Sequence, residues 1–542
     1  MKHYLTTLEE STKKCWDRLS VCDYGGEKFT YGQVATEIKK MHLVFQKAGI
    51  AKGDKIAICA RNSARWAVAF WASNTYETVT VPILADFQPD SITNLVNHSD
   101  SVIFFTDPDI WAKLDSASFP GLKAVISEKD FSLLYATPEF EKIYAGKEDL
   151  FKEKYPDGMK PEDVHYPVNN MDDLAIINYT SGTTSDPKGV MLTYGAISDT
   201  DAFSNTQFPN TPEDTMISML PLAHMYGLAI EFIHPNVDGV SVWFLGKTPS
   251  PSLLLRAMAD VKPYMVVTVP LVMEKIYKNS LKPAMEKNPV KILLKIPGIN
   301  CLIYKKIREK LINSFGGKVL CFIMGGAALN PEVERCFKKM KLPYTVGYGM
   351  TEACPLLGYE WWTRFVPGSC GKPVHELRID STDPQNIPGE IQVKGANLTI
   401  GYYKNPEVTE QSFTEDGWFK TGDLGVLDKD RNIFIRGRIK SMILSSNGQN
   451  VYPEEIEAVI SYIDGVAECL AVQRGDKIYG LVYPDNDFYS ALSEEEKTAW
   501  QEKVRKEANT KLPSYSQLFK IEIREAPFQK TPKMSIKRFL YN

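Results

Sequence analysis

Short apolar runs alternate with amphipathic stretches through most of the first 440 residues of the chain. The apolar runs are rich in β-branched and aromatic residues, and we predict strands at 55–60, 79–83, 101–106, 124–127, 174–179, 240–245, 265–269 and 319–324. Between these runs, residues 37–48 and 63–75 place most of their apolar side chains on one helical face. Such alternation predicts an α/β chain whose sheets are largely parallel and whose crossovers are helices.

The pattern changes from about Asp383, where Pro and Gly separate short alternating segments. The segments GEIQVKG, NLTIGYY, DGWFKTGDLGVLD and NIFIRGR predict an antiparallel β section. After Lys440 the pattern changes again, and the predicted elements are a helix at 451–464, strands at 467–473 and 478–483, a charged helix at 493–512 and a strand at 519–524.

These patterns divide the chain unequally. We expect an N-terminal body, residues 1–438, built of mixed and parallel sheets sandwiched by helices together with the β section. A separate α+β domain, residues 439–542, would follow it, with a boundary near Lys440. A chain of 542 residues is also too long for one hydrophobic core.

Composition excludes several classes of protein. The chain has 63 Lys and Arg against 67 Asp and Glu, a net charge of −4, with 44% apolar and 24% charged residues. These values are typical of a globular protein, not of a disordered chain or a polybasic nucleic-acid binder. The nine cysteines are scattered without a CxxC pair, which argues against a disulfide framework or a zinc ribbon. The N-terminus lacks the apolar core of a signal peptide, and we expect a cytoplasmic protein with no membrane span.

One stretch departs from this even charge balance. Residues 275–318 contain eleven Lys or Arg against two Glu. A basic helical surface of this kind could meet anionic lipid, which would place the protein peripherally at the inner membrane face, or it could meet a phosphate-rich ligand. A solvated face on helices whose Leu, Ile and Tyr residues pack inward is the alternative.

The segment YTSGTTSDPKG, residues 179–189, follows the buried strand LAIIN. Its hydroxyl side chains, glycines and lysine are the groups that hold phosphate oxygens. It is not a Walker A loop, because five residues separate Gly182 from Lys188 and the second glycine follows the lysine; nor does it contain GxGxxG. Composition alone allows an ordinary solvent loop at this place.

Five motifs in order change that interpretation. YTSGTTSDPKG, GYGMTE (347–352), KTGD (420–423), GRIK (437–440) and NVYPEEIE (450–457) together resemble the adenylate-forming superfamily of acyl-CoA synthetases, luciferases and adenylation domains. The likeness runs from about Thr30 to the C-terminus. The segments LPLAHMYG (220–227), GDKIAICARNSARWAVAFWA (53–72), VPGSCGKPV (366–374) and KTPKMSIKRFLY (530–541) look most like fatty-acid, often long-chain, acyl-CoA ligases.

The resemblance implies a two-step reaction that uses ATP, Mg²⁺ and coenzyme A. A fatty acid and ATP first give acyl-AMP and pyrophosphate, and the acyl group then passes to the CoA thiol. The residues that the family places on the β- and γ-phosphates correspond to Thr180, Ser181, Gly182, Thr183, Thr184 and Lys188. Ser185 stands where the family usually has glycine.

The same resemblance assigns the rest of the nucleotide site. Thr351 would contact the α-phosphate and Glu352 would bind Mg²⁺, a pairing that suits a metal held by one carboxylate and substrate phosphates. The remaining assignments are Tyr348 stacked on adenine, Gly326, Ala327 and Ala328 lining it, Asp423 and Arg438 on the ribose, and Lys440 at the pivot of the small domain. Taken singly, each charged residue could equally be a solvated or ion-paired surface group.

His224 in LPLAHMYG lies in a markedly apolar stretch, where a satisfied core histidine is the alternative. The resemblance places it beside the substrate carboxylate. For the thiol step, the family rotates its small domain and brings a segment like SSNGQNVYP (445–453) toward the thiol; Gly448 and Asn450 match that segment, whereas Asn447 replaces a usual glycine.

The C-terminal segment departs from the family pattern KTxxGKIxR. Its catalytic lysine aligns with Ser535 and its glycine with Met534. Lys533 and Lys537 flank Ser535 at two residues either way, and in an extended segment all three side chains share one face. We hypothesise that Lys533 or Lys537 supplies the charge, or that adenylation is slow; a lysine pair with no catalytic duty is the alternative.

Three functions therefore compete. The first is a fatty-acid–CoA ligase, and the second is adenylation of another carboxylic acid, or transfer to another acceptor. The third, motivated by Ser535, is a protein that holds ATP or acyl-AMP without turnover.

Overall fold

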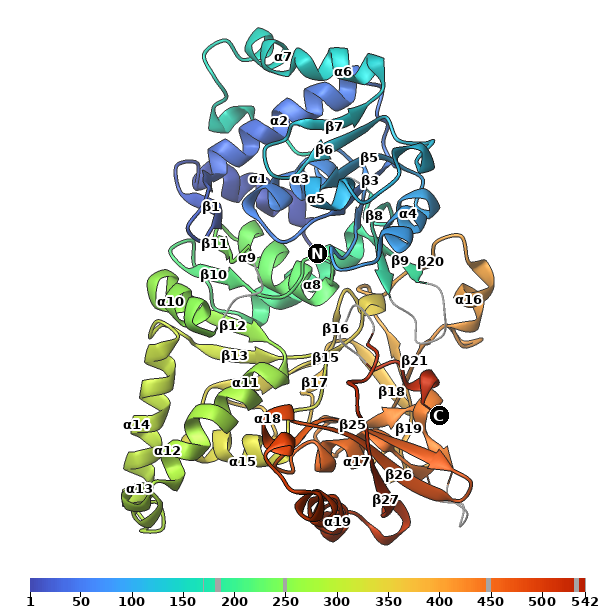
Figure 1. Ribbon diagram of the computed structural model, residues 1–542. Coiled ribbons are helices and arrows are strands. Elements are labelled where there is room, and N and C mark those ends of the chain that lie inside the picture. Colours follow the sequence, from blue (N-terminus) through green and yellow to red (C-terminus); the bar gives the residue numbers. More distant parts are fainter. Residues whose placement is uncertain (169, 181–186, 247–250, 445–449, 531–535, 542) are drawn as a thin grey trace. The chain divides into compact units, whose positions relative to one another are not determined.

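The computed structural model describes residues 1–542 except 169, 181–186, 247–250, 445–449, 531–535 and 542 (Figure 1). The described residues form two compact units. The first contains Met1–Thr180, Pro187–Val374 and Gly395–Ser412, and the second contains His375–Lys394 and Phe413–Asn542.

An eight-stranded sheet in the order β20-β9-β8-β4-β3-β5-β6-β7 organises the first unit. Its strands are β3 (Lys55–Cys59), β4 (Val79–Pro82), β5 (Ser101–Thr106), β6 (Ala124–Ser127), β7 (Leu133–Ala136), β8 (Leu174–Thr180), β9 (Lys188–Thr193) and β20 (Gly401–Tyr402). The five central strands from β8 to β6 are parallel, whereas β7, β9 and β20 pair antiparallel at the two edges. Parallel strands need helical crossovers, and these cover the sheet.

Two crossover helices show how local sequence sets these elements. Helix α2 (Tyr31–Lys47) begins with a capping box in which Thr30 and Gln33 satisfy each other's backbone N–H groups. Helix α3 (Ala64–Asn74) begins at Ser63, whose side chain accepts from the backbone N–H of Trp66. Every residue of α3 except Arg65 is buried, since it runs through the main core beneath the sheet.

Three further sheets complete the first unit. One has the order β10-β11-β1-β2, with β1 (Leu19–Asp23), β2 (Lys28–Thr30), β10 (Thr215–Ser218) and β11 (Ser241–Phe244). A parallel sheet joins β12 (Met265–Thr268), β13 (Cys321–Met324) and β14 (Tyr344–Val346), and an antiparallel one joins β15 (Tyr348–Gly349), β16 (Leu356–Tyr359) and β17 (Lys372–Pro373).

The other helices of the first unit are mostly short. The longer ones are α1 (Tyr4–Lys14), α4 (Pro89–His98), α6 (Pro138–Ala145), α7 (Lys147–Lys154), α8 (Tyr194–Gln207), α10 (Pro251–Val261), α14 (Ile299–Ser314) and α15 (Pro331–Met340). The shorter ones are α5 (Pro108–Trp111), α9 (His234–Val237), α11 (Pro270–Ile276), α12 (Lys282–Glu286), α13 (Asn288–Leu293) and α16 (Pro406–Gln411), together with a π-helix at Gly227–Ile233.

The second unit contains two larger sheets. An antiparallel sheet has the order β18-β19-β21-β22, with β18 (Glu376–Asp380), β19 (Gly389–Lys394), β21 (Phe419–Leu427) and β22 (Ile433–Arg438). Strands β25 (Val466–Arg474), β26 (Lys477–Pro484) and β27 (Leu518–Ile523) form the other, with a small ladder of β23 (Ile443–Leu444) and β24 (Asn450–Val451). Helices α17 (Pro453–Ile460), α18 (Asn486–Ser490) and α19 (Glu494–Lys511) accompany them, and a hydrophobic core lies within residues 443–523.

The predicted α/β class and nearly all predicted elements are confirmed. The strands at 101–106 and 124–127 have the expected bounds, and the others differ by one or two residues at their ends. One segment differs in kind. Within NLTIGYY only Gly401–Tyr402 is a strand, and it pairs with β9 at the edge of the main sheet instead of joining the antiparallel section.

All nine cysteines lie in the described parts of the chain and none forms a disulfide. Among the described residues, no helix combines the length and the apolar character needed to cross a bilayer.

Candidate functional site

Strands β8 and β9 form the base of the predicted phosphate site. Thr180 ends β8, Lys188 begins β9, and the two residues pair across the antiparallel ladder. The Lys188 ammonium lies 5.4 Å from the centre of the Tyr402 ring, within range of a cation–π contact. Of the other residues predicted to hold the phosphates, Ser181, Gly182, Thr183 and Thr184 lie outside the described residues.

The predicted magnesium ligand Glu352 lies in the short 3-10 turn Thr351–Ala353, and it is 9% exposed. The Tyr402 hydroxyl donates to Glu352 Oε1 at 3.0 Å. Burial, together with the adjacent Glu352 charge, raises the pKa of Tyr402 far above its usual range, so this hydroxyl keeps its proton. Tyr402 therefore joins Lys188 and Glu352 in one cluster, although only the latter two were predicted.

The segment 397–402 fixes the Glu352 turn next to β9. Asn397 Nδ2 donates to the carbonyl oxygens of Ala353 and Leu356, at 2.8 and 2.6 Å. The backbone N–H of Thr399 donates to Glu352 O at 2.8 Å, and the Thr399 hydroxyl donates to Met191 O of β9 at 2.7 Å. These bonds tie the carboxylate-bearing turn to the strand that carries Lys188.

The predicted adenine-lining residues follow β13 in a solvent-exposed turn. Gly326 has φ +82°, and a Cβ placed on it would meet no heavy atom within 4 Å. Ala327 and Ala328 are also exposed, whereas Gly325 is buried. Tyr348, the predicted stacking residue, is buried in β15. An open turn of small residues leaves room for a planar base.

His224 lies in the loop between β10 and the π-helix Gly227–Ile233, and it is half-buried. Asn62 holds this loop from one side: its Nδ2 donates to Leu220 O at 2.7 Å, and its Oδ1 accepts from the Leu222 N–H at 2.9 Å. From β8, Asn178 Nδ2 donates to Ala223 O at 3.0 Å. The loop is thus held by two buried or half-buried amides.

Glu231 also holds the loop that carries His224, through hydrogen bonds to residues 218–220. Its side chain is fully buried, and its Oε2 accepts from Ser218 Oγ and from the backbone N–H groups of Met219 and Leu220, at 2.9 to 3.0 Å. Burial raises the pKa of Glu231 to about 8, and the three donors oppose this shift. Glu231 belongs to the π-helix that follows the His224 loop. A π-helix is a type of turn that is frequent at functional sites.

In the second unit, the predicted ribose residues face each other across two strands. Asp423 of β21 pairs with Arg438 of β22, and Arg438 Nε lies 2.9 Å from Asp423 Oδ1. The Arg438 side chain is 62% exposed and that of Asp423 is 7% exposed. Lys440 follows in the exposed 3-10 turn Ile439–Ser441. An ionised carboxylate oriented by a guanidinium can accept from two hydroxyls.

The described residues at the two ends of the C-terminal segment pair with each other. Lys530 pairs with Ile536, and the Lys537 N–H donates to Gln529 O at 2.9 Å. Lys530 Nζ contacts Glu468 at 2.6 Å, and Arg538 pairs with Glu457. Lys533 and Ser535 lie outside the described residues, as does Gly448. Asn450 begins the ladder strand β24.

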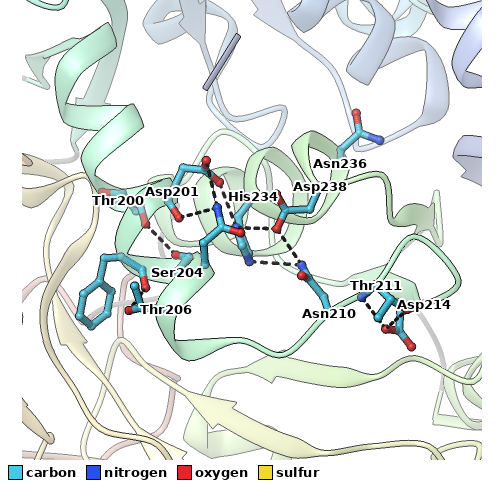
Figure 2. Close-up of polar contacts among 12 residues, drawn as sticks. Thr200, Asp201, Ser204, Thr206, Asn210, Thr211, Asp214, His234, Asn236 and Asp238 are labelled. Atoms are coloured by element: carbon cyan, nitrogen blue, oxygen red, sulfur yellow. Dashed lines mark hydrogen bonds and ion pairs between the residues drawn. The ribbon is translucent and has the colours of Figure 1, made fainter. Parts of the chain in front are cut away.

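A separate buried network in the first unit contains metal-binding residue types (Figure 2). His234 Nδ1 lies 3.0 Å from Asp201 Oδ1 and 3.8 Å from Asp238 Oδ2, and Asn210 Nδ2 donates to Asp238 Oδ2 at 3.1 Å. Burial raises the pKa of Asp238. Because these groups satisfy one another, we interpret the network as a link between α8 and α9 instead of an ion site.

The residues of the first unit suit ATP and Mg²⁺. A buried carboxylate and a hydroxyl at 351–352 form an oxygen donor set, Lys188 adds positive charge, and the open turn at 326–328 has room for a base. Tyr402 and Glu231 were missed by sequence reasoning. Their only signals were a Gly-Tyr-Tyr run in a segment assigned to the β section and one acidic residue within an apolar stretch.

Comparison with known families matches residues 8–403 to the AMP-binding enzyme family and residues 440–541 to the AMP-binding enzyme C-terminal domain. The long-chain-fatty-acid–CoA ligase 5 of Rattus norvegicus is 30% identical over 472 residues, which cover 79% of this chain and 67% of that protein. The putative acyl–CoA ligase YdaB of Bacillus subtilis is 27% identical over 468 residues, covering 84% and 83%.

Solved structures share the fold. ATP-bound MatB from Rhodopseudomonas palustris superposes with a TM-score of 0.74 at 23% identity, covering 98% of both chains. The anthranilate CoA ligase AuaEII in complex with anthranoyl-AMP superposes with a TM-score of 0.78 at 18% identity, covering 99% of this chain and 96% of that one. The two family matches together account for nearly all of the sequence in the order that the five motifs predict, and the chain therefore belongs to the AMP-binding enzyme family of adenylate-forming enzymes.

Proposed function

We propose that this chain is a fatty-acid–CoA ligase that joins a fatty acid to ATP, releases pyrophosphate and passes the acyl group from acyl-AMP to the thiol of CoA, releasing AMP. The observation that carries the proposal is the cluster of Lys188, Glu352 and Tyr402 at the ends of β8 and β9. It combines the positive charge and the carboxylate that a polyphosphate substrate with its metal requires.

In this proposal the protein supplies position and charge. The carboxylate oxygen of the fatty acid attacks the α-phosphorus of ATP, and the bond to the β-phosphate oxygen breaks as pyrophosphate leaves. Lys188, with the hydroxyl and backbone groups of 180–184, receives the charge that grows on the leaving pyrophosphate. Thr351 donates to the α-phosphate, and His224 donates to the acid. Mg²⁺ held by Glu352 would neutralise phosphate charge when bound.

The ribose and thiol steps use the second unit. Asp423, oriented by Arg438, accepts from the ribose hydroxyls. We propose that residues 439–542 rotate about Lys440 after adenylation and that Gly448 and Asn450 then approach the pantetheine thiol. The thiolate attacks the acyl carbon, and AMP leaves.

The choice of a fatty acid rests on relatives, several of which are named as long-chain acyl-CoA ligases or synthetases at 27 to 30% identity. Solved structures of the same fold include an o-succinylbenzoate CoA synthetase and an anthranilate CoA ligase. Adenylation of such an acid, or transfer to another acceptor, is the second candidate. The third candidate, binding without turnover, is favoured by Ser535 at the position of the family's catalytic lysine.

One assay separates these candidates. AMP formation is measured with acids of increasing chain length, with aryl acids and without acid, each with and without CoA. We expect AMP release that depends on a fatty acid and on CoA. Turnover with aryl acids alone would select the second candidate. Nucleotide binding with no AMP formed for any acid would select the third and overturn the ligase proposal.

The same proposal includes a cytoplasmic protein that meets the inner membrane face. A long-chain acid partitions into bilayers, so an enzyme acting on it gains substrate concentration at a membrane surface.

A further inference from the structure

Helices α13 and α14 carry large apolar side chains into solvent. Ile292 is 63% exposed and Leu302 is 62% exposed. Three more exposed residues of the same kind lie between them, and we name the five the apolar tip: Ile292, Leu293, Ile296, Ile299 and Leu302. Figure 1 shows α13 at the far end of the projection that α12 and α14 form.

No residue from Lys282 to Lys310, a stretch described without gaps, is buried. The turn Pro297–Gly298, with Gly298 at φ +85°, connects α13 to α14. The alternative in which the Leu and Ile residues of the basic stretch pack inward holds for Leu281 and Leu311, which are buried, but not for the residues of the apolar tip. Isolated exposed apolar residues are ordinary, but five within eleven residues form a patch that normally marks an interaction site.

Lysines border this patch. Lys287 and Lys291 precede it in sequence, Lys305 and Lys306 follow it, and Lys295 lies within its span; all five are exposed. Residues 275–318 carry eleven basic and two acidic side chains, a local charge of 11 − 2 = +9. A second copy docking face to face on this patch would bring two such charges together, which disfavours self-association.

We propose that the apolar tip docks on an anionic lipid bilayer. Its Ile and Leu side chains enter the boundary between headgroups and acyl chains, and the bordering lysines contact the lipid phosphates. Apolar residues beside lysines are the combination that holds a helical segment in the plane of a membrane surface, since long lysine side chains reach the headgroups while their stems stay apolar. The proposal does not depend on the reaction catalysed.

Cys301 offers a labelling site within the apolar tip for measuring insertion into the bilayer. Cys301 is exposed and lies between Ile299 and Leu302. An environment-sensitive fluorophore attached to Cys301 reports whether the tip enters the bilayer, and a Cys301→Ser protein controls for labelling elsewhere. The full chain is mixed with vesicles of phosphatidylcholine alone and with vesicles that also contain phosphatidylglycerol, and binding is followed by co-sedimentation.

Two variants test the two components. Ile292→Ser/Leu302→Ser removes apolar contacts and should abolish the fluorescence shift. Lys291→Glu/Lys295→Glu should weaken binding by at least about tenfold at low salt, because each lysine near an anionic surface contributes roughly fivefold. Matched controls on the second unit, Ile387→Ser and Lys503→Glu/Lys506→Glu, change side chains that are also exposed and should leave binding unchanged.

The outcomes are distinct. We expect binding to anionic vesicles with a blue shift at Cys301. The shift should be abolished in Ile292→Ser/Leu302→Ser, binding should be weakened in Lys291→Glu/Lys295→Glu, and both should be retained in the controls. Binding that survives Ile292→Ser/Leu302→Ser without a shift would overturn insertion. Binding lost equally in the controls, or concentration-dependent dimerisation that the tip variants abolish in the absence of vesicles, would overturn the lipid proposal.

Discussion

The Tyr402 hydroxyl donates to the Glu352 carboxylate at 3.0 Å while the face of the same ring lies 5.4 Å from the Lys188 ammonium. One side chain thus contacts both charged residues of the proposed phosphate site. It does so because β20 joins the edge of the main sheet beside β9. Removing the hydroxyl changes the support of Glu352 without removing the ring beneath Lys188.

Tyr402→Phe should therefore lower kcat/KM for ATP by roughly tenfold, since a hydrogen bond to a charged group contributes about 1.5–3 kcal/mol. Steady-state kinetics over a range of Mg²⁺ concentrations measures the effect, and excess Mg²⁺ should restore part of it. Tyr403→Phe is the control, because the Tyr403 hydroxyl donates to the exposed Asp100 at 2.8 Å. Equal kinetics for both variants would contradict a role for Tyr402.

Asp423→Asn should raise KM for ATP at least tenfold, because an amide oxygen accepts ribose hydroxyls more weakly than an ionised carboxylate. Fluorescence titration with ATP and with a 2′,3′-dideoxy analogue separates ribose contacts from phosphate contacts: the variant should bind both equally. Asp416→Asn breaks a comparable pair, with Arg378 at 2.7 Å in the same unit, and should leave nucleotide affinity unchanged. A variant that still prefers ATP to the analogue as strongly as the parent does would remove Asp423 from the ribose site.

The C-terminal lysines are tested by pyrophosphate release. We expect either Lys533→Ala or Lys537→Ala to lower the rate by roughly a hundredfold and Ser535→Lys to raise it, because a positive charge near the reacting phosphate stabilises the transition state. Lys530→Ala is the control: its ammonium pairs with Glu468, so its loss should lower thermal stability and not the rate of the folded protein. Unchanged rates in both alanine variants would contradict the hypothesis that Lys533 or Lys537 supplies the charge of the family's catalytic lysine.

Glu231 predicts a pH dependence of folding. Its pKa in the folded protein is about 8, raised by burial from an ordinary 4.5. The folded state therefore holds a proton that the unfolded state releases, so this contribution is fully present below about pH 4.5 and is lost as the pH rises through about 8. Between pH 6 and 9 the free energy of unfolding should fall less in Glu231→Gln than in the parent protein, by roughly 3 kcal/mol or less.

Urea unfolding across that pH range makes the measurement. Glu128, whose pKa burial also raises to about 8, should retain its own share of the dependence in the Glu231→Gln protein. Glu496→Gln is the control, because Glu496 is exposed and its backbone and side-chain hydrogen bonds with Ser493 lower its pKa. Parallel curves for the parent and Glu231→Gln would show that Glu231 does not titrate in this range.

Local patterns determined the elements. Strands such as 101–106 and helices such as α19 were predictable because apolar periodicity and capping residues act within a few neighbours along the chain. The five motifs likewise indicated the family, since each is a continuous segment whose residue types serve one kind of ligand.

The tertiary structure decided what no local pattern encodes. Tyr402 reaches Glu352, fifty residues earlier, only because an edge strand pairs with β9, and Glu231 became the support of the His224 loop only because a π-helix turns it onto Ser218. Likewise, the lysines of residues 275–318 are visible in the sequence, but only the fold determined that Ile292 and Leu302 are exposed beside them. Period and composition are properties of neighbours in sequence, whereas burial and contact depend on which distant segments come together in space.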